Sequence, residues 1–339
     1  MLEPPQLKDQ KVIDCLRDEY GLIVKTIAFL PLGADLNTAV YRVVTNDETV
    51  YFVKLRKAEF NPACVAVPNL LGELGVKQVI SSIKTKAKQS WADLPPFKLI
   101  LYPFVEGQHA YERNLSPQQW AEFGATLKKL HEADIPAAIK SHIPRDDFSP
   151  EWSDRLKRFL KQIEKETFND SVAVELADFL RSKNNALLEL LAQTERCRKK
   201  LLERLPEFVL CHADIHGWNL LIDKNNALYM VDWDTLIFAP KERDLMFIGG
   251  GFGDSGYSPQ QEETLFYQGY GREDVNQTAI AYYRSARIIE DIAIYCEQIF
   301  LSDEGGQDRQ EALEIVKFNF LPNGTIAMAY RPVGVAEGI

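Results

Sequence analysis

The spacing of apolar and polar positions near the N-terminus predicts a short helix followed by three strands. Residues 7–20 carry apolar groups at helical spacing, and Gly21 ends the run. The strands, rich in Val, Ile, Tyr and Phe, are expected at residues 22–32, 38–45 and 49–55. Asn46 and Asp47 favour a tight turn between the last two. The chain therefore opens with an antiparallel sheet.

The third of these strands carries a lysine in an otherwise apolar row. Alternation places Val50, Phe52 and Lys54 on one face. An unpaired ammonium away from water is costly, so Lys54 needs a partner such as a bound phosphate, unless it is an edge-strand lysine that reaches solvent. The loop before the second strand contains Gly33 and Asn37, which suit a loop over phosphates, although it matches neither G-x-G-x-x-G nor the P-loop pattern.

Beyond these strands the pattern becomes mainly helical. A continuous apolar run at 97–105 predicts one more buried strand, and the boundary between a sheet lobe and a helical lobe is expected directly after it. Ser116 followed by Pro and by Gln119 is a helix start. Apolar spacing over 151–205 predicts two amphipathic helices. The fold class is therefore α+β.

Composition and charge limit the kinds of partner. The 339 residues are 46% hydrophobic and 26% charged, as in folded globular proteins. The formal charge of −10 disfavours a nucleic-acid binder and suits a cationic small molecule. Five scattered cysteines without a C-x-x-C pair indicate reduced thiols. With no signal-like start and no long apolar segment, we expect a cytoplasmic protein that does not enter a membrane. We also expect a monomer.

Residues with catalytic chemistry gather after a short apolar strand. His212, Asp214 and Asn219 form the pattern H-x-D-x-x-x-x-N, and a predicted hairpin then ends at Asp232 and Asp234. Phosphoryl transfer requires a carboxylate that accepts the proton of a hydroxyl, and oxygen ligands for magnesium. Asp214 fits the first role, Asn219 and Asp232 the second, and His212 is expected to brace the loop. Individually, such residues are also common as helix caps and in turns.

The order of strand lysine, H-x-D-x-x-x-x-N segment and strand-end aspartate resembles the aminoglycoside phosphotransferase family over nearly the whole chain. The resemblance implies a bilobal protein-kinase-like fold, with a small antiparallel-sheet N-lobe and a larger, mainly helical C-lobe. It implies ATP and Mg²⁺ as cofactors. The implied organisation is a nucleotide-binding lobe at 1–106 with a hinge near 101–107, a catalytic and acceptor-binding lobe at 107–331, and a tail at 332–339.

The same resemblance assigns roles to individual residues. Lys54, with Gly33 and Asn37 in the loop before it, would contact the nucleotide phosphates. The Pro103 carbonyl and the Val105 amide would bind adenine. In addition, Asp232 would hold magnesium in place of the DFG aspartate of protein kinases, and Asp244 would stabilise the catalytic loop.

One expected residue of the family pattern has no clear counterpart. A helix glutamate should pair with Lys54, yet Pro68 and Asn69 occupy the region where it belongs. Glu59 and Glu73 are the nearest candidates and are poorly placed. We therefore expect Lys54 to be ordered by the nucleotide or by another carboxylate such as Asp232.

The resemblance of the sequence as a whole implies an aminocyclitol antibiotic as acceptor, with the 9-hydroxyl of spectinomycin as the expected target and resistance as the result. Asp234 and Asp254 are candidates for binding its ammonium groups. The glycine-rich segment around Asp254 is equally well explained as a solvent-exposed turn. The alternatives are a kinase for choline, a sugar or an amino alcohol, and a non-catalytic nucleotide-binding module.

Overall fold

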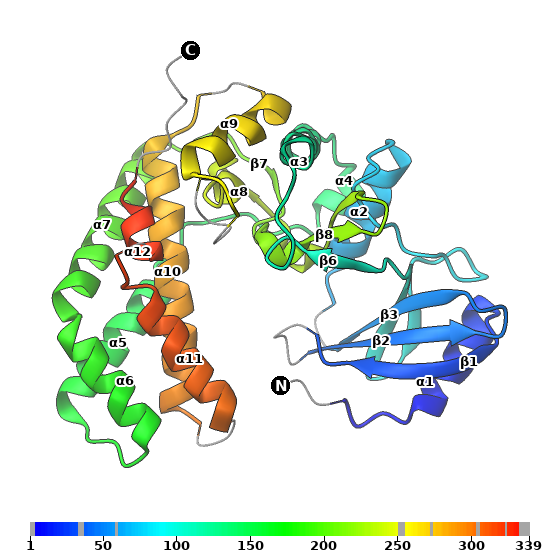
Figure 1. Cartoon of the computed structure of the whole chain (residues 1–339), viewed down its shortest axis with the longest axis horizontal. Helices are drawn as coiled ribbons and strands as arrows, with labels where there is room; N and C mark the ends of the chain where they lie inside the picture. The colour runs from blue at the N-terminus through cyan, green and yellow to red at the C-terminus, as the bar shows by residue number, and fades with distance from the viewer. Residues whose placement is uncertain are drawn as a thin grey trace. The chain divides into compact units, whose positions relative to one another are not determined.

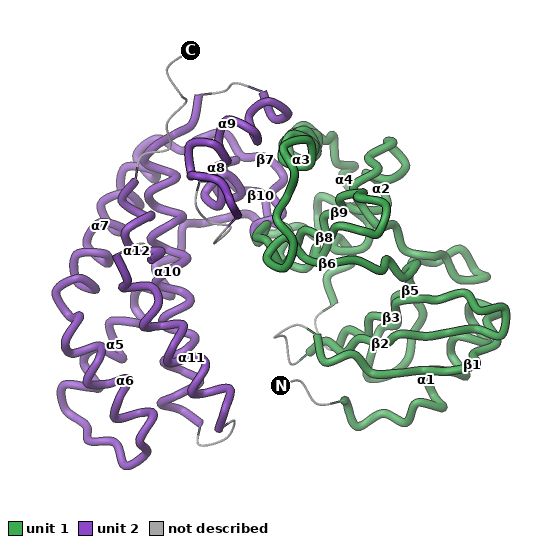
Figure 2. Tube along the Cα trace, viewed as in Figure 1, with its two compact units in different colours: residues 1–144, 214–236 green, residues 145–213, 237–339 purple. Residues whose placement is uncertain are grey.

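The computed structural model describes residues 4–32, 37–57, 60–249, 255–271, 274–302, 306–322 and 324–331. Backbone contacts divide the chain into two compact units, which Figure 2 distinguishes by colour. Unit 1 consists of Met1–Pro144 and Asp214–Leu236, and unit 2 of Arg145–Ala213 and Ile237–Ile339. The predicted lobe boundary near residue 106 stays a prediction.

Unit 1 contains a five-stranded antiparallel sheet with the order β1-β2-β3-β5-β4, of which Figure 1 labels β1, β2 and β3. Its strands are β1 (Val24–Leu30), β2 (Thr38–Thr45), β3 (Val50–Lys57), β4 (Ala92–Leu94) and β5 (Phe97–Pro103). The helix α1 (Asp9–Cys15) and a π-helical turn (Leu16–Tyr20) contribute Val12 and Leu16 to the core of this sheet, and Gly21 ends the turn with a φ of 78°. The short N-terminal helix and the three opening strands are thus present as predicted.

The register of the sheet fixes which side chains share a face. Val53 and Leu55 of β3 are fully buried against the core, because every second residue points to that side. Lys54 points to the opposite face, where Val40 of β2 and Ile100 of β5 are its direct neighbours across the strands. The apolar row predicted around Lys54 therefore lies on the face of the sheet away from the main core.

The rest of unit 1 surrounds a small antiparallel sheet with the order β6-β8-β9. Its elements are α2 (Ala63–Glu73), β6 (Gly107–His109), α3 (Pro117–His131), α4 (Ala137–Lys140), a 3₁₀ turn at Gly217–Asn219, β8 (Leu220–Asp223), β9 (Leu228–Met230) and a 3₁₀ turn at Trp233–Thr235. The capping box predicted at Ser116 is formed, since its side chain accepts the backbone N–H of Gln119 and the Gln119 side chain accepts the backbone N–H of Ser116.

Unit 2 is mainly helical. Its elements are α5 (Glu151–Lys165), α6 (Ser171–Ser182), α7 (Asn184–Glu203), β7 (Val209–Cys211), β10 (Ile237–Ala239), α8 (Glu242–Leu245), α9 (Pro259–Tyr270), α10 (Gln277–Phe300), α11 (Gly306–Phe318) and α12 (Thr325–Ala329). Strands β7 and β10 form an antiparallel pair. The longest helix, α10, packs against α5, α7 and α11 around one apolar core.

The expectation of two helices over 151–205 was wrong, because this segment forms three. Asp170 caps the start of α6 by accepting the backbone N–H of Ala173. A single residue, Lys183, separates α6 from α7, so the apolar spacing continues almost unbroken across the bend and hides it in the sequence. No helix among the described residues is long and apolar enough to cross a membrane. The tail predicted at 332–339 lies outside the described residues.

Candidate functional site

Lys54 lies at the centre of a cluster of charges in unit 1. Its Nζ donates to Oδ1 of Asp232 at 3.0 Å and to Oδ2 of Asp234 at 2.7 Å. The Lys54 side chain is only 15% exposed, so these two carboxylates supply the partners that an ammonium away from water requires. Both acids come from the short segment after β9, some 180 residues later in the sequence.

Arg56 adds a second cation to this cluster. Because it follows Lys54 by two residues on β3, it projects from the same face of the sheet. Its Nη1 donates to Oδ2 of Asp234 at 2.7 Å and to the Thr38 hydroxyl at 2.7 Å. One carboxylate oxygen of Asp234 thus accepts hydrogen bonds from both cations, and only 19% of this side chain is exposed. Sequence reasoning placed Asp234 with the acceptor and missed Arg56.

The charges of this cluster stabilise one another. Burial by itself would lower the pKa of Lys54, but the carboxylates of Asp232 and Asp234 outweigh it and raise this pKa above its ordinary value. Burial, and then the nearby negative charge of Asp234, raise the pKa of the Cys64 thiol to about 12. Lys54 is therefore positively charged at neutral pH.

The H-x-D-x-x-x-x-N segment places Asp214 and Asn219 in contact, also in unit 1. The Asn219 amide Nδ2 donates to the Asp214 carbonyl at 2.7 Å and to its Oδ2 at 3.3 Å. His216 accepts the Trp218 backbone N–H at its Nδ1, so its Nε2, 3.4 Å from Oδ2 of Asp214, is the nitrogen that carries the proton. The Asp214 carboxylate is thereby oriented by two side chains.

His212 and Asp244 lie together in unit 2. The buried Asp244 carboxylate accepts the backbone N–H of His212 at 2.9 Å and of Ala213 at 2.6 Å. Ala213 has a φ of 69°, an unfavourable conformation for a residue with a Cβ, and Asp244 holds it there. Because Asp214 is the next residue in the chain, this arrangement fixes the backbone that leads into the rest of the H-x-D-x-x-x-x-N segment.

The donor set for a metal ion consists of oxygen atoms. Since the Asn219 amide nitrogen is engaged with Asp214, its side-chain oxygen is left as the possible ligand. The Asp232 carboxylate is 51% exposed, and the backbone of Asp232 has a φ of 61° that turns the chain sharply after β9. A carboxylate and an amide oxygen fit a hard cation such as Mg²⁺.

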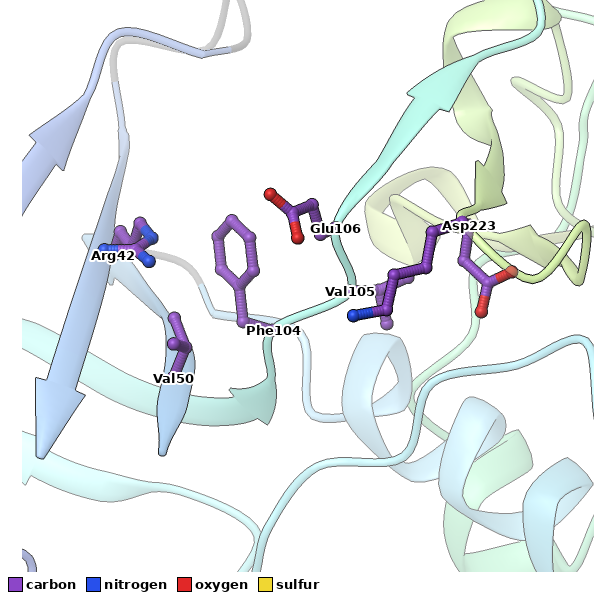
Figure 3. A pocket seen from close by; sticks show the side chains of 7 residues that line it. Arg42, Val50, Phe104, Val105, Glu106 and Asp223 are labelled. Atoms are coloured by element: carbon purple, nitrogen blue, oxygen red, sulfur yellow. The ribbon is translucent and has the colours of Figure 1, made fainter. Parts of the chain in front are cut away.

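The segment predicted to bind adenine lies at a pocket of about 280 Å³ within unit 1, shown in Figure 3. Phe104, Val105 and Glu106 form one wall, between β5 and β6. Arg42 lies over the Phe104 ring, with its guanidinium carbon 5.5 Å from the ring centre. The other lining residues are Val50, Asp223 and Lys224. Its volume is just below the usual range for ligand sites, and the predicted contact Val105 lines it.

The remaining predicted residues are described only in part. Pro103 ends β5 directly before the pocket wall, and Asn37 is exposed next to the start of β2, where its carbonyl accepts the Lys57 backbone N–H at 2.8 Å. Gly33, Asp254 and Glu59 lie outside the described residues. Glu73, the other glutamate considered for Lys54, is exposed in the last turn of α2.

A group of aromatic side chains beside Asp214 was not predicted. The Tyr111 ring lies 5.5 Å from the Trp218 ring and 6.4 Å from His216, and His109 lies 5.5 Å from Trp218. Trp218 is 51% exposed and Tyr111 39% exposed. Gly217 permits this packing, since a Cβ there would meet the Tyr111 ring at 2.9 Å. The available sequence signal was the tryptophan itself, Trp218, between Gly217 and Asn219.

Comparison with known proteins shows to which family the chain belongs. The model of the APH phosphotransferase enzyme family matches residues 28–283, which is most of the chain. The chain belongs to this family. As an APH phosphotransferase it is a kinase that transfers a phosphoryl group to a hydroxyl acceptor. The bilobal, protein-kinase-like α+β fold expected from the sequence is confirmed by solved relatives. No curated protein sequence matches the chain significantly.

Two solved structures of spectinomycin phosphotransferase are similar to this APH phosphotransferase over nearly its whole length. The complex with ADP and spectinomycin is 33% identical, covers 96% of this chain and 98% of its own, and has a TM-score of 0.89. The complex with AMP is 32% identical, with coverage of 97% and 99% and a TM-score of 0.84. An aminoglycoside phosphotransferase from Alicyclobacillus acidocaldarius, 16% identical with coverage of 96% and 95% and a TM-score of 0.65, shares the fold.

Proposed function

We propose that this APH phosphotransferase transfers the γ-phosphoryl group of ATP to the 9-hydroxyl of spectinomycin, and that this transfer gives resistance to the antibiotic. The support is the 33% identity and near-complete mutual coverage with a relative solved with ADP and spectinomycin. The net charge of −10 favours a cationic acceptor of this kind. The proposal includes magnesium as cofactor and the cytosol as location, the latter because all five cysteines are free thiols.

The observation that carries the catalytic part of this proposal is the position of Asn219. Its side chain binds Asp214, while its carbonyl accepts the backbone N–H of Val231 at 3.0 Å, directly before Asp232. The candidate base and the candidate metal ligand are therefore held in one hydrogen-bonded unit. Catalysis of phosphoryl transfer depends mainly on such positioning and on charge neutralisation.

The proposed mechanism is a direct in-line transfer. Asp214 orients the acceptor hydroxyl and takes its proton as the oxygen forms a bond to the γ-phosphorus. The bond between the γ-phosphorus and the bridging oxygen breaks at the same centre, and ADP leaves with that oxygen. Lys54 supplies positive charge to the phosphates. Asn219 and Asp232 would hold magnesium, which neutralises phosphate charge when bound.

The pocket at Phe104–Glu106 supports adenine binding by the neighbouring backbone. In the proposal, the Pro103 carbonyl accepts from the adenine amino group and the Val105 amide donates to the ring, as in the family pattern. The apolar side chains of Val50 and Phe104 suit the faces of a flat heterocycle. Phosphates would then extend toward Lys54 on the same face of the sheet.

The test is a coupled assay of ATP turnover with magnesium and five acceptors: spectinomycin, kanamycin, streptomycin, choline and homoserine. We expect robust transfer to spectinomycin alone, with the product phosphorylated at the 9-hydroxyl by NMR. Transfer to another acceptor would keep the kinase and refute the proposed substrate. ATP binding without transfer to any of the five would refute the proposed reaction for these acceptors.

A further inference from the structure

The sequence has no clear counterpart of the helix glutamate that is expected to pair with Lys54. In kinases of this type the strand lysine is held by a glutamate from the helix that follows the third strand. Here the corresponding helix, α2, has Glu73 as its one acid, exposed in the last turn. The α2 residue beside the charge cluster is Cys64, which is 6% exposed and whose pKa is raised by burial and then by the nearby negative charge of Asp234.

We propose that Asp234 is the residue that positions Lys54 for the nucleotide phosphates, in place of a carboxylate from α2. Its Oδ2 lies 2.7 Å from Lys54 Nζ, closer than Oδ1 of Asp232 at 3.0 Å. Arg56 holds the same oxygen from a second direction. Asp234 is therefore a positioning residue on the nucleotide side of the site.

The charges and exposure of the cluster indicate different roles for Asp232 and Asp234. Lys54 and Arg56 balance Asp232 and Asp234, so the cluster is neutral. The Asp232 side chain is 51% exposed, which leaves it accessible to a metal cation. The Asp234 side chain is 19% exposed and is bound by Lys54 and Arg56. Lys54 therefore keeps one carboxylate partner when Asp232 is engaged elsewhere.

The backbone of the segment also favours this role. Asp234 lies in the 3₁₀ turn Trp233–Thr235, which packs against α2. Trp233 anchors the turn, because its buried ring donates from Nε1 to the Met230 carbonyl at 3.1 Å. The turn that follows Asp232 thus holds Lys54 in place through Asp234. Lys54 therefore does not need a carboxylate from α2.

The test compares Asp234→Asn with the double variant Asp234→Asn/Cys64→Glu, which returns a carboxylate to α2. The first measurement is ADP binding by calorimetry without magnesium and without acceptor. We expect Asp234→Asn to raise the ADP Kd about tenfold or more and to lower kcat/KM for ATP about 10²-fold, because it leaves two cations, each only 15% exposed, with one carboxylate fewer. We expect Cys64→Glu to recover at least tenfold of that loss in kcat/KM.

A matched control removes a carboxylate from an exposed pair on the same sheet. Asp93 of β4 pairs with Lys98 of β5, and their side chains are 70% and 38% exposed. Asp93→Asn is expected to change neither ADP binding nor turnover, since exposed ion pairs contribute little. Melting temperatures of all variants show whether each is folded, and the double variant decides the question by itself if Asp234→Asn does not fold.

Three results would overturn the proposal. A folded Asp234→Asn variant that binds ADP normally but has a raised KM for the acceptor would place Asp234 with the acceptor. Normal metal-free ADP binding with a weakened dependence on magnesium would make it a metal ligand. A folded double variant no better than Asp234→Asn would show that a helix carboxylate cannot replace it. The proposal rests on nucleotide use in the proposed function, but ADP binding tests it even if no acceptor is phosphorylated.

Discussion

Removal of the Asp244 charge tests how the backbone before Asp214 is held. In Asp244→Asn the side chain keeps its shape but has one acceptor oxygen, whereas the carboxylate accepts two backbone N–H groups, from His212 and Ala213. The new NH₂ group would face one of these donors. Since Asp244 is fully buried, no solvent can replace the lost partner.

The magnitude follows from the two hydrogen bonds. A hydrogen bond to a charged group contributes about 1.5–3 kcal/mol, and a buried donor left unsatisfied costs about 1–3 kcal/mol. Loss of one bond and weakening of the other give about 3 kcal/mol of lost stability. For a unit of this size that corresponds to a melting temperature lower by roughly 6–12 °C. Ala213 is then no longer held at a φ of 69° and should relax, which displaces Asp214. We therefore expect turnover, measured at a temperature at which the variant is folded, to be at least tenfold lower than that of the parent.

Differential scanning calorimetry and the coupled turnover assay would measure both effects. The control is Asp178→Asn, which removes a carboxylate of unit 2 that is 67% exposed and paired with Arg181, and should shift stability by less than about 0.5 kcal/mol. An Asp244→Asn protein that melts within about 2 °C of the parent and retains full turnover would contradict the reasoning.

Three further predictions concern single side chains. Asp214→Asn should lower kcat about 10²-fold or more with ADP affinity unchanged by calorimetry, because only proton transfer is lost. Trp218→Ala should raise the spectinomycin KM about 2–30-fold and leave the ATP KM unchanged, with Trp218→Phe in between, if its exposed ring contacts the acceptor ammonium groups. Asp170→Ala should destabilise α6 by about 1 kcal/mol at pH 7. The Ala173 amide and then Arg309 lower the pKa of Asp170, so its contribution is present above the unfolded pKa near 4, and denaturation curves of variant and parent should converge as pH falls through the lower folded value.

The local elements could be predicted because their signals are local. Alternation identified the strands around Lys54, and the capping box identified the start of α3 at Ser116. The bend between α6 and α7 was missed because one residue, Lys183, separates them without a Gly or Pro. Hydrophobic spacing reports which face is buried and says little about where a helix changes direction.

The partners within the site could be predicted only in part. The roles predicted for Lys54, Asp214, Asn219 and Asp232 rest on residue types and order. The pairing of Asp234 with Lys54 and Arg56 was not, because it joins residues about 180 positions apart and depends on the register of β3 and on a turn after β9. The absence of a glutamate near Pro68 was the sequence signal that some other carboxylate must take that place.

The division of unit 1 into two stretches of sequence has a consequence for synthesis on the ribosome. All five strands of the large sheet lie between residues 24 and 103, so the sheet is complete in the nascent chain long before Asp214, Asp232 and Asp234 are made. The intervening residues 145–213 belong to unit 2 and are synthesised before residues 214–236, which complete unit 1. More than a hundred residues are therefore added after Lys54 and Arg56 before the carboxylates that bind them are synthesised. A chain released before residue 232 contains all strands of the large sheet but lacks Asp232 and Asp234, the carboxylates that bind Lys54 and Arg56 in the folded protein.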